Sequence, residues 1–280
     1  MQKAYKKYAP AFLIPTAAAF AVAFVIPFIL GLYLSFCEFS TVSDASFVGL
    51  KNYLAVLSKS DFLNSLFFTV EFCLVSVILV NVLAFLLALL LTKGLKGTNF
   101  FRTVFFMPNL IGGIVLGYIW QLIINGVLYK FGYSVTSNPA FGYWGLIILM
   151  SWQWIGYMMV IYIAALQNVP PVLIEAAMVD GANSKAVLRH ITLPSIRPAF
   201  TICLFLSITN GFKLFDQNLA LTAGAPAGRT EMLALNIFNT FYGRTGAEGM
   251  GQAKAVIFSV IVAAIALLQL YLTNKKEFDG

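Results

Sequence analysis

Two groups of polar and aromatic side chains interrupt long apolar runs in the second half of the sequence. These residues are Trp152, Gln153 and Tyr157 in one run, and Asn210, Lys213 and Asp216 in the next. Planar polar groups beside aromatic faces suit a carbohydrate, because a pyranose has hydroxyl groups at its rim and C–H groups on its faces. In the second group, one helical turn separates each residue from the next. We predict that both groups line a substrate pathway.

A structural interpretation of the same residues stays open. Lys213 and Asp216 stand three positions apart and can pair with each other, as ionisable groups inside a membrane often do. The tryptophan side chains can equally anchor a helix at the membrane interface, which is our interpretation for Trp144.

The composition indicates that these residues lie within a membrane. Of the 280 residues, 60% are hydrophobic and only 10% are charged. A soluble domain of this length has nowhere to bury so much apolar surface. The net charge of +7 is more typical of cytoplasmic cations facing anionic lipid than of nucleic-acid binding. The sequence therefore predicts an all-α polytopic membrane protein.

Catalytic and metal chemistry has little support. His190 is the single histidine, and the three cysteines lie in or beside apolar runs without the spacing of a metal site or a disulfide framework. No glycine-rich loop ending in Gly-Lys-Ser or Gly-Lys-Thr is present to cradle a nucleotide phosphate. We expect a transport subunit with no catalytic residue, metal or cofactor of its own.

Hydrophobic runs predict about six membrane spans in one transmembrane domain, residues 1–280. The expected spans cover residues 10–37, 65–91, 103–124, 142–166, 199–221 and 253–272, with a polar loop at 170–196. Pro108, Gly112 and Gly113 weaken the hydrogen-bond ladder of the third span and permit close helix contact.

The distribution of basic residues predicts the orientation of these spans. Eleven of the 18 Lys and Arg residues fall on the side of the N-terminus, six fall on the opposite side, and Lys213 is within a span. Because cytoplasmic loops carry the excess of Lys and Arg, we expect both termini and the 170–196 loop in the cytoplasm.

The polar loop itself carries the signals of two short helices joined by a sharp turn. Pro170 and Pro171 suit a first helical turn, where a missing N–H has no consequence. Gly181 can end that helix, because glycine adopts a positive φ without penalty. Asn183 or Ser184 can then cap a second helix.

This loop resembles the E-A-A loop of the membrane subunits of ABC importers. The residues that match its pattern without a gap are Glu175-Ala176-Ala177, Gly181 and Ile191-Thr192-Leu193-Pro194. The form Asp180-Gly181-Ala182 is typical of the sugar-importing branch. Two other stretches, Val48–Tyr53 and Leu221–Pro226, are similar to segments of sugar permeases.

The resemblance implies that the loop is a coupling helix seated in a groove of a cytoplasmic ATPase. In that family the glutamate at the position of Glu175 forms a salt bridge to the ATPase, and the glycine at 181 shapes the turn. The residues assigned to ATPase coupling on this basis are Glu175, Ala176, Ala177, Asp180, Gly181, Ala182, Leu193 and Pro194. In related maltose-type permeases, sugar contacts fall on the two helices that carry the predicted pathway residues.

The expected partners also follow from the resemblance. They are a second homologous permease subunit, two ATP-binding subunits that hold ATP and Mg²⁺, an extracellular solute-binding protein, a sugar such as an oligosaccharide, and the lipid of a bacterial cell membrane, with no nucleic acid. Closure of the ATPases would then rock the paired membrane subunits to give alternating access.

Two other functions remain open at this point. A permease of the same type for another solute, such as glycerol phosphate or an amino-sugar, would favour Arg or Lys in its cavity, where only Lys213 is available. An ion-coupled secondary transporter would need no ATPase and should show paired broken helices. A membrane enzyme lacks a suitable set of catalytic residues.

Overall fold

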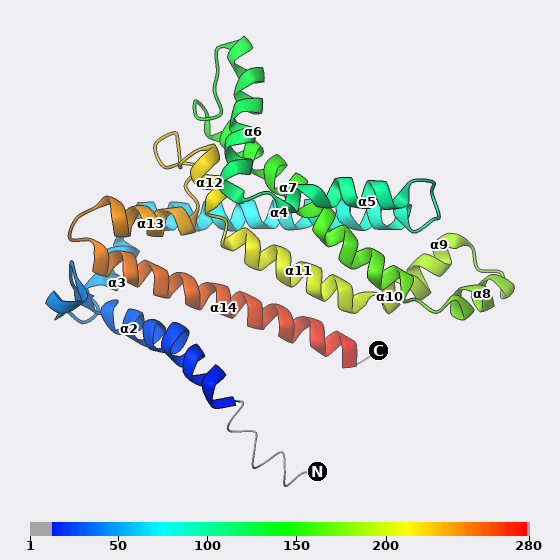
Figure 1. Ribbon diagram of the computed structural model, residues 1–280, viewed down its shortest axis with the longest axis horizontal. Helices are drawn as coiled ribbons and strands as arrows, with labels where there is room; N and C mark the ends of the chain where they lie inside the picture. The colour runs from blue at the N-terminus through cyan, green and yellow to red at the C-terminus, as the bar shows by residue number, and fades with distance from the viewer. Residues whose placement is uncertain (1–12, 279–280) are drawn as a thin grey trace, which may run out of the picture. The chain divides into compact units, whose positions relative to one another are not determined.

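The computed structural model describes residues 13–278 of the chain, and most of them are helical (Figure 1). Lys3, Lys6, Lys7 and the start of the first expected span lie outside these residues. The helices and strands are η1 (Ala21–Val25), α2 (Ile26–Leu34), β1 (Cys37–Glu38), η2 (Val42–Asp44), β2 (Ser46–Phe47), α3 (Lys51–Ser58), α4 (Ser60–Leu91), α5 (Thr98–Phe106), η3 (Met107–Leu110), α6 (Gly113–Leu128), η4 (Tyr129–Phe131), α7 (Pro139–Gln167), α8 (Pro171–Val179), α9 (Ser184–Val187), η5 (Leu188–Thr192), α10 (Leu193–Ser195), α11 (Arg197–Phe212), α12 (Asp216–Leu221), α13 (Leu233–Gly243) and α14 (Glu248–Phe278).

The prediction of about six membrane spans is confirmed for the described part of the chain. Five helices there are long and apolar enough to cross a membrane, or six if one bent pair is counted as a span. The five are Leu13–Leu34, Ser60–Leu91, Gly113–Phe131, Pro139–Gln167 and the part of α14 up to Tyr271. The bent pair joins Ser184–Ser195 to Arg197–Phe212 at an angle of 65°.

Two expected spans are not continuous helices. The stretch predicted at 103–124 divides into α5, the short turn η3 and α6, with the break at Pro108 and Gly112. Proline has no N–H to donate, so the ladder fails where it stands. The stretch predicted at 199–221 divides at Lys213 into α11 and α12.

The chain contacts group into two compact units, which are described separately. The larger unit comprises residues 63–236 and 261–280, and the smaller comprises residues 1–62 and 237–260. Whether the whole chain forms one transmembrane domain, as the sequence predicts, therefore stays a prediction.

Helices α4, α7 and α11 form the core of the larger unit. Its buried members include Val80, Ala84, Met158, Tyr162 and Cys203. Within this apolar cluster, Asn81 donates to Ser207 Oγ at 2.9 Å and accepts from the Tyr162 hydroxyl at 2.8 Å. A buried polar group in an apolar surrounding is tolerated when it is hydrogen-bonded, so these bonds fix the relative register of three helices.

Helix α5 approaches α7 closely at Gly156. A Cβ atom at this glycine would overlap the carbonyl group of Phe105 and the backbone nitrogen of Phe106. The absence of a side chain therefore lets the two backbones touch, as small residues do between membrane helices. This contact holds the end of α5, just before the break at η3, against the middle of α7.

The smaller unit contains a two-stranded antiparallel sheet and an ion pair whose lysine is buried. Strand β1 pairs with β2 through Cys37 opposite Phe47, and the buried Asn52 side chain donates to the Cys37 carbonyl at 2.8 Å. Lys254, near the start of α14, is completely buried, and its Nζ lies 3.5 Å from Asp61 Oδ2.

Candidate functional site

The 170–196 loop forms the predicted helix, turn and helix. Helix α8 covers Pro171–Val179, and α9 begins at Ser184. The Asn183 side chain caps α9 by accepting from the backbone N–H of Ala186 at 2.9 Å. The second helix continues through η5 and α10 to Ile196, where the chain bends into α11. In Figure 1 these short helices follow α7 and lead back into α11.

Gly181 makes the turn between α8 and α9 possible. Its φ is +86°, in the left-handed region. The N–H of Ala182 donates to the Ala177 carbonyl at 2.9 Å, and the N–H of Gly181 donates to the Met178 carbonyl at 3.1 Å. These two bonds form a Schellman motif, which satisfies carbonyls at the end of a helix and needs a left-handed residue at this position.

The surface of the loop offers both apolar and acidic contacts. Glu175, Ala176, Asp180 and Gly181 are exposed, whereas Ala177, Ala182, Leu193 and Pro194 are half-buried. Val172 is 71% exposed and Val179 is 87% exposed on the same short helix. Large apolar side chains next to an exposed carboxylate are typical of a surface that another protein covers.

The predicted pathway residues of α7 do not all face the same surroundings. Trp152 is exposed, and its ring packs edge-to-face against Trp120 of α6 with centroids 5.6 Å apart. Gln153 is buried instead. Tyr157 is half-buried, with its ring 6.4 Å from Phe106 of α5.

The buried Gln153 is held by a residue that the sequence analysis did not select. Gln217 of α12, also buried, donates from Nε2 to Gln153 Oε1 at 2.8 Å. The Gln153 amide in turn points to the Ile111 carbonyl, 3.5 Å away, at the break between α5 and α6. The two amides therefore join α7 to both interrupted spans.

Helix α6 lies directly against α12 (Figure 1). A Cβ atom at Gly117 would come within 2.6 Å of the Ala220 Cβ, and one at Gly113 within 2.7 Å of the Asp216 Cβ. Gln121 adds a hydrogen bond of 3.0 Å to the Leu221 carbonyl. The two glycines thus position the helix that begins with the predicted pathway residue Asp216.

The residues predicted on the fifth span are placed around its break. Asn210, half-buried near the end of α11, donates to the Leu206 carbonyl at 2.8 Å. Lys213 lies in the break and Asp216 begins α12, and both side chains are exposed. Among the side chains that the structure describes, residues 13–271, the recorded ion pairs include Lys51–Glu38, Arg244–Asp61 and Lys254–Asp61, and none joins Lys213 to Asp216. The possible pairing of Lys213 with Asp216 is therefore not formed.

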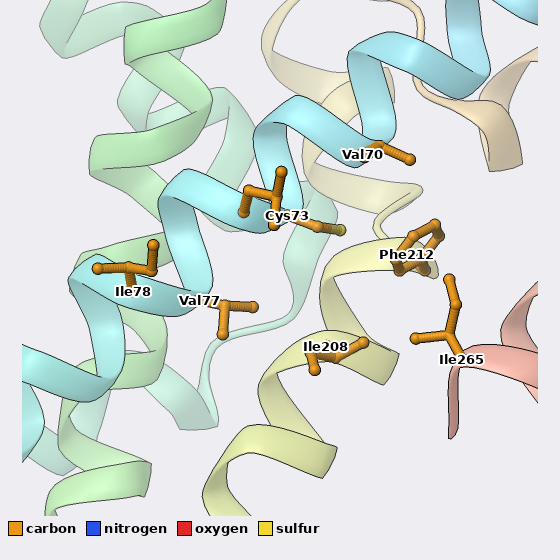
Figure 2. Close-up of a pocket in the computed structure, with 8 residues that line it drawn as sticks. Val70, Cys73, Val77, Ile78, Ile208, Phe212 and Ile265 are labelled. Carbon is orange, nitrogen blue, oxygen red and sulfur yellow. The ribbon is translucent and has the colours of Figure 1, made fainter. Parts of the chain in front are cut away.

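A cavity of about 240 Å³ in the larger unit has a different character. Figure 2 shows side chains of α4, α11 and α14 directed towards it, among them Cys73, Phe212 and Ile265. All of its lining residues are apolar or thiol-bearing, so it offers a sugar no hydrogen-bonding partner. None of the predicted pathway residues lines it.

Comparison with known proteins identifies the family. Residues 81–277 match the family described as binding-protein-dependent transport system inner membrane component. The chain belongs to this family. The resemblance to ABC importer permeases is thereby confirmed, and the chain is a transport permease subunit that crosses the membrane several times. An ion-coupled secondary transporter does not fit this assignment.

Individual relatives of this binding-protein-dependent permease cover almost its whole length. It is 44% identical to the probable starch degradation products transport system permease protein AmyD of Thermoanaerobacterium thermosulfurigenes, over 96% of this chain and 94% of that protein. It is 32% identical to the arabinooligosaccharides transport system permease protein AraP of Bacillus subtilis, over 98% and 91%. A crystal structure of a bacterial ABC transporter involved in alginate import shares the fold, with a TM-score of 0.83 at 20% identity over 98% of both chains.

Replacing Gln153 with leucine tests whether this side chain serves packing or substrate. The change leaves the buried Gln217 amide without its partner, which should lower the free energy of unfolding by about 1–3 kcal/mol. The double variant Gln153→Leu/Gln217→Leu should recover most of that loss, because no unpaired amide remains. Thermal unfolding of the purified variants measures the loss and its recovery. An unchanged unfolding midpoint for Gln153→Leu would contradict a stabilising hydrogen bond between Gln153 and Gln217.

Proposed function

We propose that this permease forms half of the translocation pathway of an ATP-driven oligosaccharide importer. The observation that carries the proposal is the 44% identity, over nearly the whole chain, to a relative named for starch degradation products. A second relative, named for arabinooligosaccharides, supports the same class of solute. The exposed Trp152 and the exposed polar ends of α11 and α12 supply the aromatic and polar groups that a sugar needs.

The remaining parts of the importer are proposed from the same reasoning. A second homologous permease completes the pathway, two copies of an ATPase bind ATP and Mg²⁺, and an extracellular binding protein delivers the sugar. The exposed α8 and the turn at Gly181 are proposed to dock on the ATPase, with Glu175 as the ion-pairing residue. Both termini then face the cytoplasm of a bacterial cell.

Uptake by the reconstituted importer tests the substrate class. Vesicles that contain the whole complex, with the binding protein outside and ATP inside, should accumulate labelled maltotriose or arabinotriose. A second candidate is glycerol phosphate, because the chain is 30% identical over 85% of its length to the sn-glycerol-3-phosphate transport system permease protein UgpA of Agrobacterium fabrum. Uptake of glycerol 3-phosphate but of neither sugar would show that the substrate is glycerol 3-phosphate and not an oligosaccharide.

Truncating Trp152 tests the aromatic contact with the solute. We expect Trp152→Ala to raise the sugar concentration for half-maximal uptake about tenfold, which corresponds to a loss of about 1.4 kcal/mol. Trp144→Ala is the matched control, since that side chain is also exposed on α7 and is interpreted as an interfacial anchor. An equal change in the sugar concentration for half-maximal uptake in both variants would show that Trp152 does not contact the solute.

A further inference from the structure

The apolar cavity between α4, α11 and α14 takes no part in the proposed sugar pathway. Its volume is about 240 Å³, and Figure 2 shows the side chains of Cys73, Phe212 and Ile265 around it on three different helices. The recorded lining residues carry no polar group except the Cys73 thiol. An apolar cavity of about 150 Å³ in another protein stays dry and binds benzene. This larger cavity therefore suits an apolar ligand and neither water nor a sugar.

The inner wall of the cavity is formed by side chains that are already packed. Cys73 and Phe212 are each 4% exposed, and Val77 is 8% exposed. Next to Phe212, a Cβ atom at Gly211 would come within 2.9 Å of the Cys73 Sγ atom, so α4 and α11 already touch there. Wall atoms that face an empty space lack dispersion contacts on that side. A ligand that fills the space would supply those contacts between α4 and α11.

The outer wall of the cavity continues into an exposed apolar surface of α4. Leu74 and Ile78 line the cavity and are also 61% and 64% exposed. Both residues lie near the middle of α4, a helix that is long and apolar enough to cross a membrane. The middle of such a helix lies in the hydrocarbon core of the bilayer, away from water and headgroups. The apolar groups that surround this side of the cavity are therefore the acyl chains of lipids.

We propose that this cavity binds one acyl chain of a membrane lipid. A linear hydrocarbon chain matches the apolar lining and needs no hydrogen-bonding partner. A helix of a partner subunit is about 10 Å across, so it is too wide to enter a space of about 240 Å³ and covers it at most. The bound chain lies against Phe212, the last residue of α11, directly before the break at Lys213. It therefore packs where the fifth span is interrupted.

Photo-crosslinking in vesicles that contain the reconstituted importer tests the proposal. The probe is a phosphatidylcholine with a diazirine in the middle of one acyl chain, and peptide mass spectrometry maps its adducts after illumination. Bulk lipid reaches Leu86, which is 49% exposed on α4, but only a chain inside the cavity reaches Phe212. We expect adducts on both side chains. A phosphatidylglycerol with the same diazirine chain should label Phe212 equally, because none of the recorded lining residues is charged.

Filling the cavity should remove the adduct on Phe212. Val77→Phe enlarges a lining side chain and should lower the Phe212 yield, relative to that of Leu86, at least about tenfold. Val82→Phe makes the same change at an exposed α4 position outside the recorded lining and should leave the ratio unchanged. If Val77→Phe does not fold, Val77→Ile adds one methylene group and should lower the ratio about fourfold. The proposal is overturned if Phe212 acquires no adduct in the native importer, if one headgroup alone gives it, or if the folded Val77 variants keep the native ratio.

Discussion

Replacing Glu175 with alanine is expected to abolish most ATP-driven uptake while the chain stays folded in the membrane. The carboxylate is exposed on α8 and has no recorded ion pair within the described residues, so its removal should leave the fold unchanged. At a docked interface, loss of one member of a desolvated charge pair costs about 2–5 kcal/mol. That corresponds to a decrease in uptake of about thirtyfold or more. ATP-driven uptake into vesicles measures the effect.

The turn at Gly181 provides a second route to the same effect. Gly181→Val places a β-branched residue at a φ of +86°, which costs at least about 1–2 kcal/mol and should displace α8. Gly181→Asn is the matched control, because asparagine tolerates the left-handed region. We expect the valine variant to hydrolyse ATP without importing sugar and the asparagine variant to transport. Normal uptake by both Glu175→Ala and Gly181→Val would contradict a coupling role for the loop.

Replacing Asp61 with alanine is expected to lower the free energy of unfolding by about 3–5 kcal/mol. Lys254 is completely buried, and its Nζ lies 3.5 Å from Asp61 Oδ2, 2.9 Å from Thr240 Oγ1 and 5.9 Å from the centre of the Phe62 ring. Replacing Asp61 removes a carboxylate that stabilises the charge of this buried ammonium group. Thermal unfolding of the purified chain in detergent measures the loss.

Replacing Lys254 instead should lower the free energy of unfolding by less than replacing Asp61. Comparing Lys254→Met with Asp61→Ala therefore tests whether the buried charge sets the cost. The Asp61 side chain is 30% exposed and lies 3.7 Å from Arg244, so in Lys254→Met it keeps water and one cation. The double variant Asp61→Leu/Lys254→Met should be more stable than Asp61→Ala, because no buried charge is left unpaired. Equal destabilisation by Asp61→Ala and Lys254→Met would show that burial of the charge does not determine the cost.

Local signals made the coupling loop predictable from the sequence. Proline at a first turn, glycine at a left-handed position and asparagine at a cap each act within a few residues. The structure shows α8 starting at Pro171, a φ of +86° at Gly181 and the Asn183 cap. Hydrophobic length likewise indicated the membrane spans. These features depend on the chain alone and not on what it packs against.

The break in the fifth span and the buried polar pairs were not predictable in the same way, whereas Pro108 and Gly112 marked the break in the third span. The apolar stretch at 199–221 has no proline at its break, and α11 ends at Phe212, just after Gly211 packs against Cys73 of α4. Gln153 and Gln217 are 64 residues apart, and Asp61 and Lys254 are 193 apart. No periodicity within a single segment reports such distant contacts. The substrate role of Gln153 stays a prediction, whereas its hydrogen bond to Gln217 of α12 had no signal in the sequence of α7.

Chemical labelling of α8 tests the central claim most directly. The three native cysteines are all buried, so Val179→Cys, at a side chain that is 87% exposed, provides a single accessible thiol. In membranes that contain only the permease subunits, we expect a membrane-impermeant maleimide to label this thiol from the cytoplasmic side. Assembly with the ATPase subunits should protect it. Labelling from the outer side, or an unchanged rate after assembly, would contradict an ATPase-docked coupling loop.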